Sequence, residues 1–150
     1  MTVHRLTRVL PYKPDQLAEL VADVDAYPSF LPWITSMRVW NRRTEPDGAR
    51  MLDAEAGVGF AMLRERFSTW VRHDRRANVV EVGLIRGPFR HLKNRWEFHP
   101  DPTGTRLEFM IDFAFKSRML DLVLQANFDR AVASLMRRFE ERAAELYGKG

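Results

Sequence analysis

The chain has 150 residues, 45% of them apolar, and a formal net charge of +4, which is typical of one globular domain and excludes a disordered chain. It contains no cysteine, which excludes disulfides and thiolate metal sites. No apolar run approaches the roughly 20 residues of a membrane-spanning helix, and Arg5, Arg8 and Lys13 interrupt any apolar signal segment, so we expect a cytoplasmic protein. The positive charge either favours an anionic partner, such as a phospholipid surface or nucleic acid, or reflects an arginine-rich solvated surface.

The N-terminal part of the chain predicts a strand, a helix and a rigid turn. Residues 2–10 are rich in β-branched and aliphatic side chains and predict the strand. Pro14 and Asp15 then open a helix, which stops before Pro28. Residues 27–33, Tyr-Pro-Ser-Phe-Leu-Pro-Trp, contain two prolines that exclude regular helix or strand, so this aromatic turn is either a plug of the core or one wall of a pocket.

A series of six strands with short connections follows, which predicts antiparallel pairing. Asp47-Gly48 marks a hairpin turn, and Gly57 with Gly59 marks a tight bend. The predicted strands cover residues 36–43, 49–56, 60–72, 79–85, 91–99 and 105–115.

The chain ends in a predicted helix over residues 117–147, which no proline or glycine interrupts. Its apolar side chains fall within one quarter of the helix circumference at about 100° per residue. Only the strands can supply a partner for so long a stripe, so we expect an α+β fold in which a curved antiparallel sheet wraps around this helix. The stripe consists of Leu124, Phe128, Val132, Leu135, Phe139 and Leu146.

No catalytic or metal-binding constellation is visible in the sequence. The histidines lack the spacing of zinc ligands, and acid pairs such as Glu108 and Asp112 are typical of a solvated strand face. We therefore expect no metal, no required cofactor and no enzymatic activity. Asp121 is a polar exception on the helix stripe, where it either favours the helix dipole or stands at the mouth of a pocket.

The side chains predicted to face inward are unusually aromatic. Large rings on a curved sheet either fill the core or leave a gap beneath the helix that suits a flat apolar ligand. From the sheet and the helix this set comprises Phe67, Trp96, Phe98, Phe109, Phe113, Phe128 and Phe139.

A basic segment runs from Arg86 to Arg95 without any acid, and Phe89 is predicted to be an exposed aromatic at its turn. Such a segment is typical of contact with a membrane surface or with RNA phosphates, and it is also compatible with a solvated hairpin.

Two motifs carry a family resemblance. Residues 27–33, together with residues 87–98, Gly-Pro-Phe-Arg-His-Leu-Lys-Asn-Arg-Trp-Glu-Phe, resemble the coenzyme Q-binding START-like family, also described as polyketide cyclase/dehydrase-like. The resemblance covers essentially the whole chain and implies a helix-grip fold, in which a seven-stranded antiparallel sheet grips the C-terminal helix around a hydrophobic tunnel. Ile34 stands where this family often has cysteine.

The resemblance implies a non-catalytic protein that holds ubiquinone or a similar polyisoprenoid lipid in support of respiratory electron transport, peripheral to the anionic inner membrane. Bacterial members are also toxins that block ribosomal subunit association, which makes the ribosome the alternative partner. A cyclase-type enzyme is a further alternative, and no DNA partner is expected. The expected ligand-binding residues, from the resemblance and the inward-facing set, are Phe30, Leu31, Trp33, Phe67, Trp96, Phe98, Phe109, Phe113, Leu124 and Phe128. The expected membrane or RNA contacts are Arg86, Phe89, Arg90 and Lys93.

Overall fold

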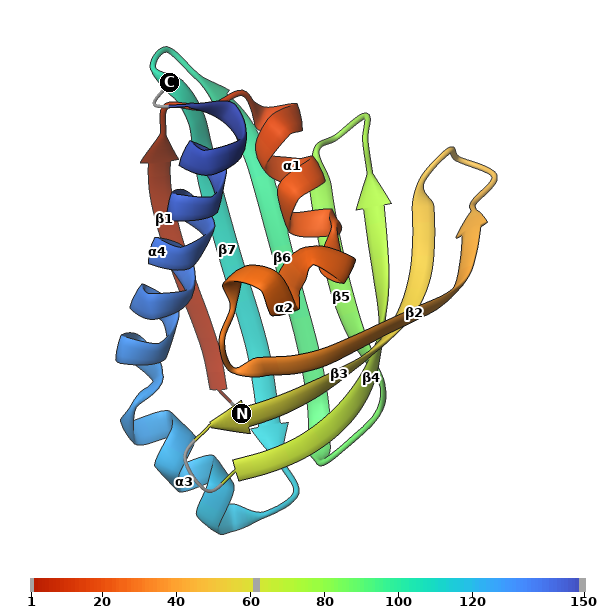
Figure 1. Cartoon of the computed structure of the whole chain (residues 1–150), viewed down its shortest axis with the longest axis vertical. Helices are drawn as coiled ribbons and strands as arrows, with labels where there is room; N and C mark the ends of the chain where they lie inside the picture. The colour runs from red at the N-terminus through yellow and green to blue at the C-terminus, as the bar shows by residue number, and fades with distance from the viewer. Residues whose placement is uncertain (1, 61–62, 149–150) are drawn as a thin grey trace.

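The protein, described here by a computed structural model over residues 2–60 and 63–148, is built on a seven-stranded antiparallel sheet that bends around its last helix (Figure 1). The strand order is β1-β7-β6-β5-β4-β3-β2, so the first strand pairs with the last and the others follow as a meander. The strands are β1 (Thr2–Leu10), β2 (Ile34–Thr44), β3 (Arg50–Phe60), β4 (Leu63–Asp74), β5 (Val79–Arg86), β6 (Phe89–Asp101) and β7 (Gly104–Phe115).

The helices lie between β1 and β2 and after β7. In Figure 1, α4 runs along β1 and β7, while α1 lies over β4, β5 and β6 on the same side of the sheet and α2 lies against β2. No helix among the described residues combines the length and the apolar character needed to cross a membrane. The helical elements are α1 (Pro14–Ala22), the 3-10 helix η1 (Val24–Ala26), α2 (Tyr27–Phe30), α3 (Arg118–Ala126) and α4 (Phe128–Tyr147). This arrangement confirms the predicted helix-grip fold.

The predicted uninterrupted helix over residues 117–147 is wrong, because the chain breaks at Asn127 into α3 and α4. The Asn127 side-chain amide donates a hydrogen bond to the Val123 carbonyl at 2.8 Å, and the Asn127 backbone N–H donates to the Leu124 carbonyl at 3.1 Å. These local bonds compete with the regular helical pattern and end α3. The two helices can therefore take different directions, as Figure 1 shows.

The predicted apolar stripe of the last helix is confirmed in its middle and is wrong at its C-terminal end. Phe128 and Phe139 are buried against the sheet, as predicted, but Leu146 is exposed. Tyr147 takes the inward position in the last turn, where its ring lies 6.3 Å from that of Tyr12. The helix therefore packs on the segment after β1 as well as on the sheet.

Two short predictions for irregular structure also fail. The aromatic turn contains the one-turn helix α2, which accepts Pro28 in its first turn, where a missing N–H costs nothing. Gly57 and Gly59 lie inside β3 rather than in a bend. A Cβ atom at Gly57 would come within 2.4 Å of the Ser36 hydroxyl, so glycine here permits close approach of β2.

Candidate functional site

The residues expected to bind a ligand lie at the interface of sheet and helices, in two core clusters. In the first cluster Leu31, Trp96, Phe98 and Phe109 are buried, with Phe30 and Trp33 partly buried against them. In the second cluster Phe113 and Phe128 are buried, with Phe67 and Leu124 partly buried against them. The structure thus brings these side chains to the predicted interface but divides them between two groups.

The rings of the first cluster are closely packed. The Trp96 ring lies 4.8 Å from the Phe109 ring and 5.3 Å from the Phe139 ring, measured between centroids. The cavity that Trp96, Phe98 and Phe139 help to line measures about 20 Å³, which is enough for a water molecule and too small for a quinone ring. A lipid could enter this region only after α1 or α4 moved, since these helices line the cavity.

Phe89 is buried, which corrects its prediction as an exposed aromatic. Its ring stacks on that of Phe115 at 4.6 Å and meets that of Phe67 edge-on at 5.3 Å. The β6–β7 register shifts between Phe89 and His91, and this bulge turns Phe89 to the core side of the sheet. Phe89 therefore contacts the second core cluster and leaves only its charged neighbours on the surface.

A groove of about 410 Å³ lies between β1 and α4, and Phe109 and Phe128 form part of its lining. The His4 ring also lines the groove and stacks on Phe128 with 3.6 Å between centroids. The His4 Nε2 atom is buried and has no hydrogen-bond partner among the described residues. Arg5, Arg8 and Asp129 line the groove beside these rings, so it is suited to a ligand that has both apolar and polar groups. The sequence analysis missed His4, because its position opposite Phe128 depends on how β1 meets α4.

The opposite side of the sheet, facing away from α4, carries many exposed cations. We call Arg38, Arg64, Arg66, Arg86, Arg90 and Lys93 the outer basic face, and all are exposed. Apart from Arg38, which lies 4.0 Å from Glu55, none of them forms an ion pair with any residue in the described ranges 2–60 and 63–148. Three of the four predicted contact residues, Arg86, Arg90 and Lys93, therefore lie together on a surface with unneutralised positive charge.

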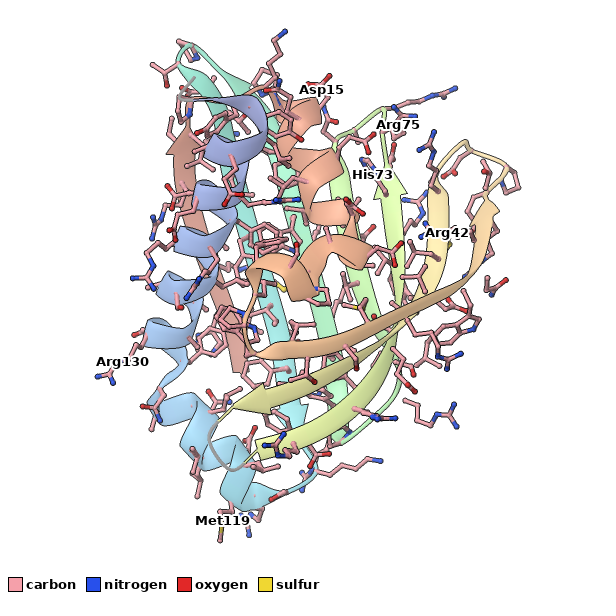
Figure 2. All side chains as sticks on the ribbon, in the orientation of Figure 1. Asp15, Arg42, His73, Arg75, Met119 and Arg130 are labelled. Carbon is pink, nitrogen blue, oxygen red and sulfur yellow. The ribbon has the colours of Figure 1, made fainter. Side chains whose placement is uncertain are left out.

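A cleft of about 540 Å³ separates α1 and η1 from the ends of β2, β3 and β4, as can be followed in Figure 2 from Arg42 to His73. His73 is only 5% exposed, and its Nε2 atom has no hydrogen-bond partner among the described residues. Burial lowers the pKa of His73, and Glu19 partly opposes this effect. The ion pairs Arg42–Asp25 and Arg75–Glu19 connect α1 and η1 to the strands around this cleft.

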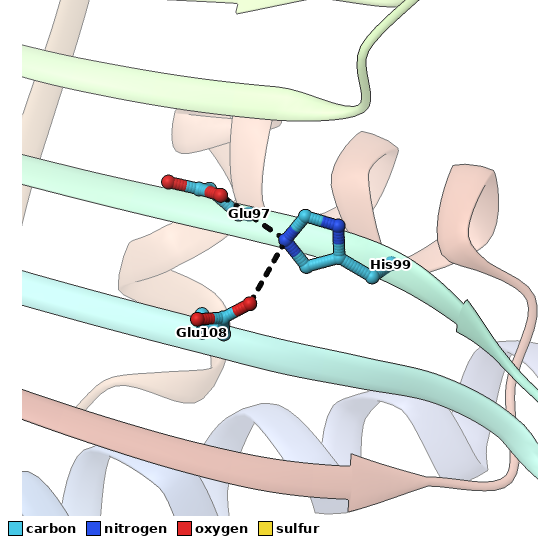
Figure 3. A group of neighbouring side chains, drawn as sticks. All are labelled: Glu97, His99 and Glu108. Atoms are coloured by element: carbon cyan, nitrogen blue, oxygen red, sulfur yellow. Dashed lines mark hydrogen bonds and ion pairs between the residues drawn. The ribbon is translucent and has the colours of Figure 1, made fainter.

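Glu97, His99 and Glu108 form the group in the described part of the chain that most resembles a metal site (Figure 3). The His99 Nε2 atom lies 3.1 Å from Glu97 and 3.0 Å from Glu108. Each carboxylate also pairs with an arginine, Glu97 with Arg95 at 2.8 Å and Glu108 with Arg106 at 3.3 Å. The hydrogen bond from Arg95 is the main reason that the pKa of Glu97 is lowered. Arg95 also pairs with Glu81 at 3.1 Å, so two arginines and His99 connect three carboxylates in an ion-pair network that joins β5, β6 and β7.

Comparison with known proteins identifies the family. The family model described as polyketide cyclase/dehydrase and lipid transport matches residues 10–140. The chain belongs to this family. The polyketide cyclase/dehydrase relatives include the "Ribosome association toxin RatA" of Rickettsia prowazekii, which is 34% identical over 93% of this chain and 94% of its own length. The protein of the same name from Escherichia coli K12 is 32% identical over 94% of this chain and 86% of its own length. The "Coenzyme Q-binding protein COQ10 homolog B, mitochondrial" of Xenopus laevis is 29% identical over 95% of this chain and 58% of its own length.

Solved structures of other proteins share the whole fold. The 18 kDa protein CC1736 of Caulobacter crescentus superposes with a TM-score of 0.82 at 55% identity over 99% of both chains. The Zhui aromatase/cyclase of Streptomyces sp. R1128 superposes with a TM-score of 0.75 at 18% identity, over 99% of this chain and 96% of its own. At that identity the second likeness concerns the fold alone.

Proposed function

We propose that this protein binds the ribosome through its outer basic face and blocks the association of the ribosomal subunits. The observation that carries the proposal is that the five cations of this face other than Arg38 have no carboxylate partner among the described residues. Unneutralised cations release counterions from nucleic acid on binding and therefore supply affinity. Relatives named for ribosome association, at 34% and 32% identity over nearly the whole chain, support the choice of the ribosome.

The experiment is sedimentation of the protein with ribosomes at about 50 mM and about 200 mM salt, together with the fraction of joined subunits in a sucrose gradient. The variant Arg64→Glu/Arg66→Glu should bind at least about ten-fold more weakly and leave more subunits joined, since each reversal replaces a phosphate contact by repulsion. Arg130→Glu, on the exposed side of α4 (Figure 2), is the control with the same change in charge per site. Equal sedimentation of the double variant and the wild type would refute the proposal.

A second candidate function is the binding of ubiquinone or a similar polyisoprenoid lipid, and the groove between β1 and α4 favours it. A turn of the His4 ring would bring its buried Nε2 atom to the groove, where it can donate a hydrogen bond to a quinone carbonyl, and Phe109 and Phe128 supply apolar surface for the isoprenoid chain. The relative named for coenzyme Q binding supports this ligand. For loading we propose peripheral contact with the anionic inner membrane through α3, where Met119 and Leu122 are more than two-thirds exposed at 76% and 71%.

Native mass spectrometry of the delipidated protein after incubation with ubiquinone tests this second function. His4→Leu should reduce uptake several-fold, because it keeps an apolar lining and removes the hydrogen-bonding nitrogen. His91→Leu, on the outer side of the sheet, is the control. In both functions the chain is proposed to act by binding, since the described residues place no nucleophile beside a general base in either site.

A further inference from the structure

Two tryptophans lie on the outer side of the sheet, in the same transverse row of paired residues. Trp40 in β2 pairs with Asp53 in β3, and Asp53 pairs with Trp70 in β4. The row continues from Trp70 to Gly83 in β5 and Lys93 in β6. Two strand spacings place the tryptophans about 10 Å apart. The outer basic face lies around this part of the row, because Arg38 is two residues from Trp40 and Lys93 is a member of the row. Beyond Lys93 the row continues to Asp112 in β7, which pairs with His91 at 2.9 Å.

Trp70 lies flat on the sheet. A Cβ atom at Gly83 would come within 2.2 Å of the Trp70 indole ring, so glycine is required for the ring to lie over the β5 backbone. Trp70 is only half-buried and belongs to neither core cluster. The face of the Trp70 ring that points to the sheet packs on Gly83, as aromatic side chains often do beside a strand glycine. The outer face of the ring has no partner among the aromatic contacts of the described residues.

Trp40 forms a second platform together with Arg38. The Arg38 guanidinium lies over the Trp40 ring, 4.5 Å from its centroid. A guanidinium plane on an indole ring is itself a surface on which a base can stack. Asp53, between the two tryptophans, is largely buried, is neutralised by Arg43 at 3.3 Å and accepts a hydrogen bond from the Asn41 side-chain amide at 2.9 Å. A nucleic-acid strand that lies across these tryptophans would therefore not be repelled by a free carboxylate at Asp53.

We propose that this row is a binding surface for single-stranded RNA, in which bases stack on Trp70 and on the Arg38–Trp40 pair while the outer basic face holds the phosphates. The proposal rests on the proposed ribosome association, which it deepens by naming the RNA contact. Stacking rings spaced along a cationic groove or face are the common device for binding single strands without sequence preference. An anionic membrane is the less suitable partner, because rings that lie flat on a sheet do not project into a bilayer.

The test measures binding of a fluorescently labelled short oligoadenylate to the full chain and to leucine and phenylalanine variants. Trp70→Leu still covers Gly83 with apolar atoms but offers no ring, and Trp40→Leu acts in the same way beside Arg38. Each should weaken binding about ten-fold. Trp70→Phe should retain most of the affinity, and thermal unfolding must show that each variant is folded.

Each outcome of this test separates the RNA surface from the ribosome proposal. If the leucine variants bind oligoadenylate as tightly as the wild type, the RNA surface is refuted. The RNA surface is also refuted if the leucine variants bind phosphatidylglycerol vesicles more weakly but bind oligoadenylate normally, because the row would then be a membrane contact. If they sediment normally with ribosomes while Arg64→Glu/Arg66→Glu does not, the ribosome proposal stands and the stacking row fails. If the wild type does not sediment with ribosomes but oligoadenylate binding depends on the rings, the ribosome proposal fails and the RNA surface stands.

Discussion

The imidazole ring of His4 stacks on the ring of Phe128 with 3.6 Å between centroids and an interplanar angle of 21°. The contact joins the first strand of the sheet to the first residue of α4. In this stacked position the His4 Nε2 atom is buried and has no hydrogen-bond partner in the described structure. Since a buried polar atom loses its hydrogen bonds to water, the site combines a favourable stack with an unfavourable desolvation.

His4→Phe should therefore raise the stability of the protein and weaken ubiquinone binding. The ring stack is kept and the unsatisfied nitrogen is removed, so the free energy of unfolding should increase by about 1 kcal/mol. Urea unfolding, followed by circular dichroism, measures the change. A lower unfolding midpoint would show instead that the Nε2 atom is satisfied in the folded protein or that the larger ring does not fit.

Asp121 holds the start of α3 against the sheet, which decides between the two alternatives for this residue. Its Oδ1 atom accepts a hydrogen bond from the Phe115 backbone N–H at 3.1 Å, so its role is structural. Asp121→Ala should lower the free energy of unfolding by about 0.5–1.5 kcal/mol. Amide hydrogen exchange should become faster in residues 118–126 and remain unchanged in β4. Exchange that is unaltered in α3 would contradict this assignment.

Strand parity was the most reliable signal in the sequence. Alternation in residues 105–115 correctly predicts that Leu107, Phe109 and Phe113 are buried, because a strand directs successive side chains to opposite faces. Phe89 was predicted to be exposed because it follows Gly87-Pro88 in a turn, but β6 already begins at Phe89, and the bulge before His91 directs its ring to the core.

Features that depend on pairing between distant residues could not be predicted. Alternation within residues 63–71 is enough to place Trp70 on the face opposite Phe67 and Val71. The alignment of Trp70 with Trp40 requires the register of β2, β3 and β4, which the separate strands do not reveal. The break at Asn127 was missed for a different reason. The Asn127 side chain donates a local hydrogen bond to the Val123 carbonyl, and the periodicity of apolar residues carries no information about such a bond.

The buried His73 should make stability sensitive to mild acid. Burial lowers its pKa below the usual 6.5, so below that pH the unfolded chain binds a proton that the folded chain does not. Its contribution is therefore complete above pH 6.5 and decreases on acidification towards the lowered pKa, by at most about 1.4 kcal/mol per pH unit. Thermal unfolding between pH 7 and pH 5 should show a weaker pH dependence in His73→Leu than in the wild type. His91→Gln, at a half-exposed site, is the control, and equal slopes for wild type and His73→Leu would disprove the prediction.

Gly83→Ala should displace the Trp70 ring from the sheet. The added Cβ atom would lie 2.2 Å from the indole carbons, so the ring must tilt away from β5, at a cost of about 1–3 kcal/mol in the free energy of unfolding. The ring then becomes more exposed, and its fluorescence should shift to longer wavelength. Gly59→Ala is the matched control, because its nearest contacts are the Thr35 methyl group at 3.1 Å and an Arg64 guanidinium nitrogen at 3.7 Å. If Gly83→Ala leaves the emission maximum and the unfolding midpoint unchanged, Trp70 does not lie on Gly83 in solution, and the flat platform proposed for RNA is lost with it.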